Sequence, residues 1–526
     1  MTDIKINVYD SSTHKGNSLF CLFNLPAGSR VLIVGESLAE WKQYFRSACF
    51  CTRTVKIGPG WNNFHIILFH PCRYSSKQLI FQDISKLKAL LAPNGYLFCL
   101  VKNFYSLATL KDLKRGLGRQ VLSATKCGYS GYKHILISQN FCHVGGYLPL
   151  PDRKMPEEIV DIGSNLLDVP YSPHWLIRFF DLIGLYRYVY DGYLFICGKQ
   201  KVGVNPFFDF LAQKIRGHLK SKNVKVSLER FDIRIRGAVV LYLLEVISGE
   251  MFIVRIVSDS RTDTIVKKNR QFLEWLHQKP ELAHIKNLVP FPVEIGAYQG
   301  VSIYIETMIP GKLAWKAIRR KVRDTIYKEA VNFIFQLNKH TKEKILLDKD
   351  KLESLFEQDL QRFNKIASIN NELKNNILKM IGIIKDKLLG RKIWLVAAHG
   401  DYGYGNILID PDTGRLQGVI DWDTGRKEEF PWIDMLNMAI QNERSNNSNM
   451  SGAVRAIASG MPFVGLISNC SIYERGFKVG NGVFKILFYI ALIRYMGRAA
   501  QYESIFNAEQ YEYLESLNYL NKALPL

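Results

Sequence analysis

The strongest constraint on the fold is a change of pattern along the chain. From about residue 29 to 140, short apolar runs such as RVLIVGES, FHIILFHP and GYLFCLVKN alternate with amphipathic segments. This alternation is typical of βαβ units. From about residue 224 longer strand-like runs follow one another, and beyond Gly311 the pattern is helical for about eighty residues. The order predicts an α/β block, then a strand-rich block, then a helical block.

The strand-rich block contains five expected strands. VKVSLER, VVLYLLEV and MFIVRIV come first, and ISGE is a turn signal between the second and third. A helical segment at 262–278 follows, and VEIGAYQGVSIYIETM then reads as a hairpin. In the helical block, apolar residues recur on one helix face, which predicts that this face is buried. They are Ile318, Val322, Ile326, Ala330 and Leu337.

The length of 526 residues exceeds what one hydrophobic core usually serves. We expect three domains, with boundaries where the patterns change: residues 1–205, 206–310 and 311–526. The stretch of about 141–220 is expected to complete the first domain and to link it to the second.

The first block resembles class I S-adenosylmethionine-dependent methyltransferases over roughly 140 residues. RVLIVGES would be the family's first strand, FHIILFHP its fourth, and LKALLAPNGYLFCLV the helix, turn and fifth strand. The turn after the first strand has one glycine, and Glu36 and Ser37 would hinder a cofactor there. The second strand, near CFCTRTVKIG, ends without the carboxylate that would bind ribose hydroxyls. We therefore favour a structural or recognition role, with an active methyltransferase, alone or in a bifunctional chain, as the alternative.

The segment HGDYGYGN, residues 399–406, and the later VIDWD contain the residue types that phosphoryl transfer requires. One carboxylate must orient or deprotonate the attacking hydroxyl, while an Asn oxygen and a second carboxylate hold Mg²⁺ against nucleotide phosphates. Asp401, Asn406 and Asp421 have these types at a suitable spacing. The intervening ILIDPDTGRLQGVID predicts a hairpin that returns Asp421 to the side of Asn406.

These motifs resemble the aminoglycoside phosphotransferase and choline kinase family over about residues 220–500. The family shows a His-Gly-Asp loop, an Asn five positions after the Asp, and an Ile-Asp-Trp-Asp or Ile-Asp-Trp-Glu strand end. The resemblance implies a two-lobed protein-kinase-like α+β fold behind the doubly wound α/β domain. It also implies ATP and Mg²⁺ as cofactors, Asp401 as catalytic base, and Asn406 and Asp421 as metal ligands.

Three further residues belong to the same motifs. His399 is expected to have a structural hydrogen-bonding role, because kinases place the chemistry on the following carboxylate. Asp434, in FPWIDMLNM, matches the family's structural aspartate. Asp423 is expected beside the metal or in its surroundings.

The resemblance also assigns the nucleotide site. Arg255 on the third strand stands where a lysine that holds phosphate is commoner, and a planar guanidinium must grip phosphate in a different pose. Its expected partner is a helix glutamate, but Asn269 falls at that position and Glu274 lies further on. The adenine should contact the connector IETMIPG, with Glu306 and Met308 as candidates. Gly237 is the candidate for the turn over the phosphates.

The residues and composition leave several functions open. The chain carries 70 Lys and Arg against 48 Asp and Glu, a net charge of +22, which attracts anionic partners. We favour an ATP-dependent small-molecule kinase whose acceptor is a small molecule or glycan, with an anionic acceptor favoured by the basic surface. A pseudokinase and a nucleic-acid-binding protein are the alternatives. Nucleic acid is not favoured, because the basic residues are dispersed through helices.

The expected location is cytoplasmic. Nine cysteines and an N-terminal segment without an apolar stretch favour a reducing compartment. The most apolar late run, VFKILFYIALIRYMG, carries Lys485 and Arg494 and is shorter than a membrane span, so we expect a buried or surface-docked helix.

Overall fold

The computed structural model describes most of the second half of the chain and parts of the first. The described residues are 29–35, 48–51, 61–70, 77–102, 129–141, 143–150, 158–161, 192–199, 206–221, 223–233, 239–317, 322–366, 368–447, 449–459, 476–477, 481–501 and 503–525. They form two compact units, which are described separately. Unit 1 runs to Thr264 and includes Val293–Met308, and unit 2 comprises Ile265–Pro292 and the chain from Ile309. The predicted division at residues 205 and 310 stays a prediction.

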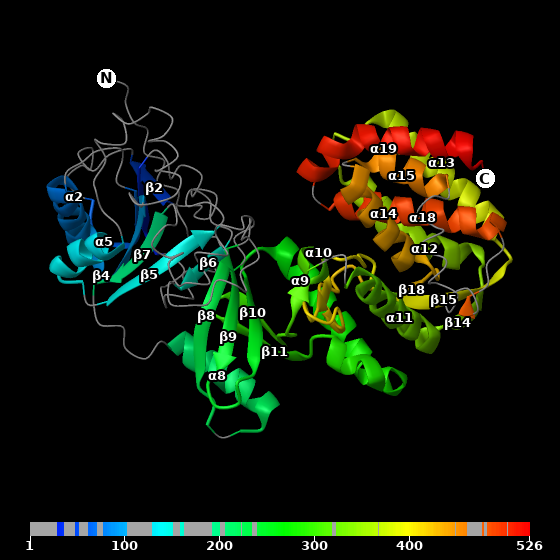
Figure 1. The fold of residues 1–526 in the computed structure, drawn as a ribbon. Helices are drawn as coiled ribbons and strands as arrows, with labels where there is room; N and C mark the ends of the chain where they lie inside the picture. The colour runs from blue at the N-terminus through cyan, green and yellow to red at the C-terminus, as the bar shows by residue number, and fades with distance from the viewer. Residues whose placement is uncertain are drawn as a thin grey trace. The chain divides into compact units, whose positions relative to one another are not determined.

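Unit 1 is built on one sheet that begins as a parallel α/β sheet (Figure 1). The spatial order β2-β1-β3-β4 is parallel throughout. The strands are β1 (Val31–Val34), β2 (Ala48–Cys51), β3 (Phe64–Phe69) and β4 (Leu91–Lys102). Helices α2 (Lys77–Leu90) and α5 (Tyr129–Ser138) belong to this part. The predicted first, second, fourth and fifth family strands are therefore present as β1, β2, β3 and β4.

Alternate residues of β1 belong to two different hydrophobic cores. Val31 and Ile33 pack in one cluster of buried residues, while Leu32 and Val34 pack in another. Successive side chains of a strand point to opposite faces, so both faces of the sheet are covered. This explains why the strand has a continuous apolar run and no alternation.

The sheet continues from the parallel strands through antiparallel ones into the strand-rich block. After β4 the order is β7-β5-β6-β8-β9-β10-β12-β11, which makes twelve strands among the described residues. The added strands are β5 (His143–Leu150), β6 (Glu158–Asp161), β7 (Gly192–Gly198), β8 (Val226–Ile233), β9 (Val239–Glu245), β10 (Met251–Val257), β11 (Pro292–Tyr298) and β12 (Val301–Thr307). Helix α8 (Pro206–Leu219) packs buried residues into the same core cluster as β9 and β10. All five strands predicted in this block are confirmed.

Gly35, directly after β1, lies against the end of β3. Its φ is +132°, and a β-carbon there would lie 3.1 Å from the His70 carbonyl oxygen. Glycine meets both demands, because only glycine adopts this backbone conformation freely and it leaves room for the neighbouring strand. Glu36 and Ser37 lie outside the described residues, so cofactor binding in this domain stays a prediction.

Unit 2 is mainly helical. Its helices are α9 from Ile265 onward (the whole helix is Ser260–Gln278), η4 (Pro280–Leu288), α10 (Ala314–Ala317), α11 (Arg323–Thr341), α12 (Lys349–Asn364), α13 (Asn371–Leu388), α14 (Ile433–Asn447), α15 (Met450–Ala458), α18 (Asn481–Ala499) and α19 (Glu503–Ala523). The predicted apolar face of α11 is buried at Ile326, Ala330 and Leu337. Ile318 lies outside the described residues.

Two short strands interrupt the stretch that was predicted to be helical. β13 (Lys312–Leu313) pairs with β16 (Ile407–Ile409), which also pairs with β17 (Leu416–Val419). β14 (Glu343–Leu346) pairs with β15 (Lys392–Ala398), which also pairs with β18 (Arg426–Glu429). Strands of two and four residues are too short to show a period in the sequence. Their pairing partners lie far along the chain, so no hairpin signal marks them either.

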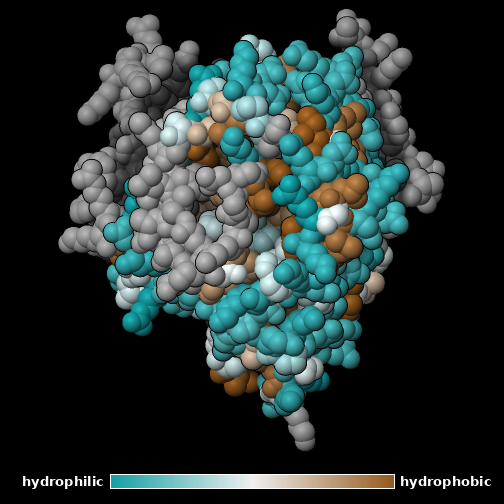
Figure 2. Space-filling view, turned by 90° about the vertical axis from the view of Figure 1, so that its right-hand side faces the viewer, coloured by the Kyte–Doolittle hydropathy of each residue, from teal (hydrophilic) through white to brown (hydrophobic). Residues whose placement is uncertain are grey.

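Helix α18 is the late apolar run, and it is buried as predicted. Its residues belong to the large core of unit 2, together with residues of α11 to α14. No helix in the described part of the chain is long and apolar enough to cross a membrane. Figure 2 shows one face of the molecule, on which hydrophilic residues predominate between smaller hydrophobic patches.

Candidate active site

The loop between β15 and β16 carries Asp401 and depends on two glycines. Gly400 has φ +83°, and a β-carbon there would overlap the Thr424 carbonyl group. A β-carbon at Gly403 would overlap the Gln441 side chain, whereas Gly405 faces open space. The glycines of HGDYGYGN therefore allow the loop to turn and to lie close to neighbouring segments.

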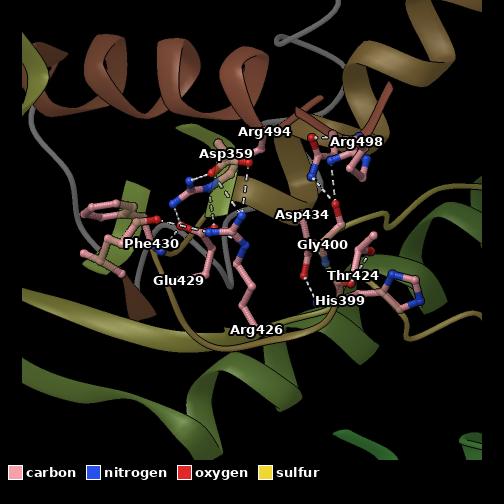
Figure 3. Close-up of polar contacts among 12 residues, drawn as sticks. Asp359, His399, Gly400, Thr424, Arg426, Glu429, Phe430, Asp434, Arg494 and Arg498 are labelled. Atoms are coloured by element: carbon pink, nitrogen blue, oxygen red, sulfur yellow. Dashed lines mark hydrogen bonds and ion pairs between the residues drawn. The ribbon is translucent and has the colours of Figure 1, made fainter. Parts of the chain in front are cut away.

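Asp434, at the start of α14, holds the turn before Asp401 in place (Figure 3). Its two carboxylate oxygens accept hydrogen bonds from the His399 and Gly400 backbone nitrogens, at 2.7 and 2.8 Å. Burial raises the pKa of Asp434 to about 7, although these two backbone hydrogen bonds favour the charged form. The carboxyl group thus fixes the backbone of the loop at two consecutive residues.

His399 connects the loop to the strand that leads to Asp421. Its Nδ1 accepts a hydrogen bond from the Asp401 backbone nitrogen at 3.3 Å, so the proton is on Nε2, which donates to the Ile420 carbonyl at 2.8 Å. Burial lowers the pKa of His399, which keeps the ring neutral. Both ring nitrogens contact backbone atoms, which is the geometry of a structural residue.

Several side chains surround the Asp401 carboxylate, which is 39 % exposed. Gln441 Nε2 donates to Oδ1 at 2.9 Å, and Arg498 Nε lies 3.1 Å from the same oxygen. Asn406 Nδ2 donates to the Asp401 carbonyl at 2.9 Å and lies 3.3 Å from Oδ2. The carboxylate is held from three sides and still reaches the surface.

A hairpin brings Asn406 next to the strand end that carries Asp421, as predicted. β16 and β17 pair antiparallel with Ile407 opposite Val419, and the Ile420 nitrogen donates to the Asn406 carbonyl at 2.9 Å. Asp421 follows with an exposed side chain and a φ of +63°. This left-handed conformation is uncommon outside glycine, and aspartate tolerates it better than most residues.

Asn269 was not expected to act here, yet it fixes the residue after Asp421. It is buried on α9, and its Oδ1 accepts a hydrogen bond from the Trp422 backbone nitrogen at 2.9 Å. Trp422 is fully buried and stacks on Phe272 of the same helix. A short buried amide at this position therefore anchors the Asp421 segment to α9.

The carboxylate partner of Arg255 is on a neighbouring strand and not on the helix. Arg255 of β10 lies opposite Tyr304 of β12, and its Nη2 donates to Glu306 Oε1 at 2.8 Å. Arg255 and Glu306 are diagonal neighbours on one face of the sheet, which brings their long side chains within reach. The family's helix glutamate is replaced by Asn269 in this chain, and Glu274, further along the helix, pairs with Arg270.

Three other predicted site residues, Met308, Gly237 and Asp423, have different outcomes. The Met308 backbone nitrogen already donates to the Met251 carbonyl at 2.8 Å, so this amide is engaged within unit 1. Gly237 lies outside the described residues. Asp423 is half-buried in the turn after Trp422, and its charge acts on Arg362.

Behind the loop lies a buried ionic network that the sequence did not reveal (Figure 3). Arg494 of α18 contacts Asp359 of α12 and donates to Glu429 of β18 at 2.7 Å. Arg426 donates to both oxygens of Asp359, at 3.0 and 3.1 Å. These charges join α12, β18 and α18 around the segment that follows Asp421. The charged residues come from parts of the chain that are far apart in sequence, so no local motif predicts their contacts.

The residues fit a magnesium ion that arrives with a nucleotide. Asn406 uses its Nδ2 toward Asp401, and among the described residues its Oδ1 accepts no hydrogen bond. An amide oxygen and the Asp421 carboxylate are ligands that Mg²⁺ prefers. The described part of the chain contains no group of three His, Cys, Asp or Glu that could hold a metal ion alone. Mg²⁺ sites of kinases are of this kind, since substrate phosphates and water supply the remaining ligands.

One segment of the chain is similar to a known protein family. Residues 242–428 match the model of the phosphotransferase enzyme family. The comparison with curated proteins found no match.

Solved structures of phosphotransferases resemble part of the chain. An aminoglycoside-3'-phosphotransferase of type VIII is 16% identical, covers 55% of this chain and 98% of its own, and has a TM-score of 0.34. The GDP complex of aminoglycoside 2'-phosphotransferase-IIIa is 12% identical, covers 60% and 99%, and has a TM-score of 0.36. The Plasmodium vivax ethanolamine kinase is 12% identical, covers 57% and 81%, and has a TM-score of 0.33.

Because these three scores are low, the assignment rests on the family model and the motifs. The matched segment contains both the Asp401 loop and the Asp421 strand end. Over residues 242–428 this chain is similar to the phosphotransferase enzyme family, which confirms the resemblance predicted from these motifs.

Proposed function

We propose that the protein transfers the γ-phosphoryl group of ATP to an alcohol hydroxyl of a small molecule. The observation that carries this proposal is the β16–β17 hairpin, which sets Asn406 beside Asp421 while Asn406 also contacts Asp401. A candidate base and two candidate metal ligands thus lie in one place. Phosphoryl transfer depends on such positioning more than on covalent chemistry.

Asp401 would act on the acceptor. Its carboxylate, partly exposed, orients the hydroxyl and takes its proton as the oxygen attacks the γ-phosphorus and the bond to ADP breaks. Gln441 and Arg498 both hold Oδ1, whereas Oδ2 accepts only the longer hydrogen bond from Asn406, at 3.3 Å, so Oδ2 would take the acceptor proton.

Asn406 and Asp421 would hold Mg²⁺. The ion would neutralise charge on the nucleotide phosphates. Arg255 is proposed to contact phosphate, with Glu306 fixing the direction of its guanidinium at 2.8 Å. His399, Asp434 and Asn269 would act indirectly, by holding the loop and the strand end that carry Asp401 and Asp421.

A thermal-shift titration tests nucleotide binding. Mg-ATP should raise the melting temperature of the wild type by mass action and should fail to do so with Asp421→Ala. Asp412→Ala, on the exposed turn of the same hairpin, is a matched control that should keep the shift. The absence of any shift at saturating Mg-ATP would refute the proposal, and a shift with S-adenosylmethionine alone would move the function to unit 1.

A further inference from the structure

A pocket with four arginines opens beside the Asp401 loop. Arg362 of α12, Arg426 of β18, and Arg494 and Arg498 of α18 line it together with Gly400, Thr424, Ile433 and one acidic residue, Glu429, which is bonded to Arg494. In Figure 3, Arg426 and Arg494 lie beside Asp359 and Glu429, and Arg498 lies near Gly400. All of these residues belong to unit 2.

Three of the four arginines are satisfied by the protein. Arg494 contacts Asp359 and Glu429, and Arg426 donates to both Asp359 oxygens and to the Leu355 carbonyl. Arg498 is held by Asp401, by the Gly400 carbonyl and by Asn437. These side chains shape the pocket, but their donors are largely in use.

Arg362 is different. Its nearest carboxylate is Asp359, at 3.7 Å, and Asp359 is already bonded to Arg426 and Arg494. Among the described residues the Arg362 guanidinium donates no hydrogen bond, although its side chain is only 15% exposed. A guanidinium has five donors, and leaving them unused in a partly buried place costs free energy.

Positive charge is in excess around Arg362. Burial, together with the like charges of Arg426 and Arg498, lowers the pKa of Arg362 to about 10, although Asp359 and Asp423 act in the opposite direction. Partial burial and the charges of Arg362, Arg426 and Lys365 also lower the pKa of Lys268 on α9. Cations that destabilise one another in this way are stabilised by a bound anion.

We propose that this pocket binds an anionic group of the acceptor, a phosphate or a carboxylate, with Arg362 as the main contact. The inference rests on the proposed function and names its substrate class: a hydroxyl compound that also carries a negative charge. A planar guanidinium can donate two parallel hydrogen bonds to either anion, which gives direction as well as charge.

The position of the pocket explains how the anion would serve the reaction. Gly400 lines the pocket and Asp401 is the next residue, while Arg498 contacts both the pocket and Asp401 Oδ1. Arg498 would therefore lie between an anion bound to Arg362 and the candidate base Asp401. A hydroxyl elsewhere on the same acceptor molecule could then approach Asp401. The excess positive charge would disfavour a cationic acceptor, which supplies selectivity.

Inorganic phosphate without nucleotide tests the site. We expect phosphate at fixed ionic strength to raise the melting temperature of the wild type and of Arg455→Gln, an exposed arginine paired with Glu515 in the same unit. Arg362→Gln should bind phosphate about 10- to 100-fold more weakly. Because the attraction of Asp359 for Arg362 is opposed by burial and by the like charges of Arg426 and Arg498, this variant should melt close to the wild-type temperature without phosphate, so misfolding would not mimic the result. Arg362→Lys should keep part of the shift.

A second variant distinguishes phosphate binding at the Arg362 pocket from phosphate binding at the nucleotide site. Arg255→Gln removes the candidate phosphate contact of the nucleotide site and should leave the phosphate shift unchanged. A shift that disappears with Arg255→Gln and persists with Arg362→Gln would overturn the proposal, and so would the absence of a shift in the wild type.

Matched acceptors test the role in catalysis. Pairs of polyols with and without a phosphate or carboxylate group, such as glycerol 3-phosphate and glycerol, would be compared by ADP formation from Mg-ATP. The charged member should be the better substrate, and Arg362→Gln should raise its KM about 10- to 100-fold with little change in kcat. Equal use of both members by the wild type, or an unchanged KM in the variant, would overturn the inference and leave the phosphotransferase proposal intact. Absence of transfer to every pair, with an Arg362-dependent phosphate shift, would instead contradict the proposed function while the anion site stood.

Discussion

Arg498 Nε lies 3.1 Å from Oδ1 of Asp401, so a residue of α18 sets the position of the carboxylate proposed to act as base. The same guanidinium contacts the Gly400 carbonyl through Nη1. One side chain therefore holds both the backbone and the carboxylate of the loop. A cation beside a base also limits how far the carboxylate can swing toward the acceptor.

Replacing Arg498 by Gln should lower kcat about tenfold or more, because Asp401 would lose its orienting contact while Gln441 remains. The KM for Mg-ATP should change little, since neither Asn406 nor Asp421 contacts Arg498 in the described structure. Steady-state kinetics on Arg498→Gln and on Arg498→Lys, which keeps the charge, would check this. Equal kcat values for the wild type and the Gln variant would contradict an orienting role.

Asn269→Ala should loosen the Asp421 segment. It leaves the buried Trp422 N–H without its acceptor, which costs about 1–3 kcal/mol of unfolding free energy. Because Asp421 precedes Trp422, the dissociation constant for Mg-ATP should rise as well. Urea unfolding and nucleotide titration would measure both, with Asn287→Ala on the exposed face of η4 as control. If the Asn269→Ala protein were less stable but bound Mg-ATP with wild-type affinity, Asn269 would stabilise the fold without positioning Asp421.

Arg255→Gln should weaken both folding and nucleotide binding. It leaves the Glu306 carboxylate, which is 11% exposed, without its cation, at a cost of about 3 kcal/mol. The double variant Arg255→Gln with Glu306→Gln should recover most of the stability but none of the phosphate contact. If the KM for Mg-ATP of the double variant matched that of the wild type, Arg255 would have a structural role only.

The stability contributed by Asp434 should decline as pH rises. Its pKa is raised by burial from 3.8 to about 7, so between these values the carboxyl group is protonated in the folded chain and ionised in the unfolded one. The folded state binds more protons there, so its stability relative to the Asp434→Asn variant should fall between about pH 4 and pH 7, by up to about 4 kcal/mol. Denaturant unfolding of both proteins at several pH values measures this difference.

Asp359→Asn supplies the opposite trend as a control. Burial opposes ionisation of Asp359, but the charges of Arg426, Arg494 and Arg362 outweigh it and lower its pKa below 3.8. Its stabilising effect should be complete above about pH 4 and should be lost as pH falls through the folded-state pKa. Parallel pH trends for the two variants would show that Asp434 is ionised in the folded protein.

The sequence predicted the parts of the site that are local. Asp401, Asn406 and Asp421 lie within one loop and one hairpin, so their types, spacing and turn residues were enough to place them together. Five strands and the helix at 262–278 were predictable for the same reason, since each has its own period.

The rest depends on contacts between distant segments. Gln441, Arg498 and Arg362 reach the site from three different helices, and each looks like an ordinary solvated helix residue in the sequence. The choice of Glu306 as the partner of Arg255 depends on the register of β10 against β12, which no local pattern specifies. The shared sheet that joins the α/β strands to the strand-rich block was likewise invisible, because it arises from the pairing of β6 with β8.

Asp401 is the proposed base of an ATP-dependent phosphotransferase. The most direct measurement is transfer of the γ-phosphoryl group from Mg-ATP to the matched hydroxyl compounds by the wild type and by Asp401→Asn, with Mg-ATP binding measured on the same samples. We predict that Asp401→Asn binds Mg-ATP as the wild type does and transfers phosphate about 10²- to 10⁴-fold more slowly. Transfer at the wild-type rate by Asp401→Asn would contradict the account.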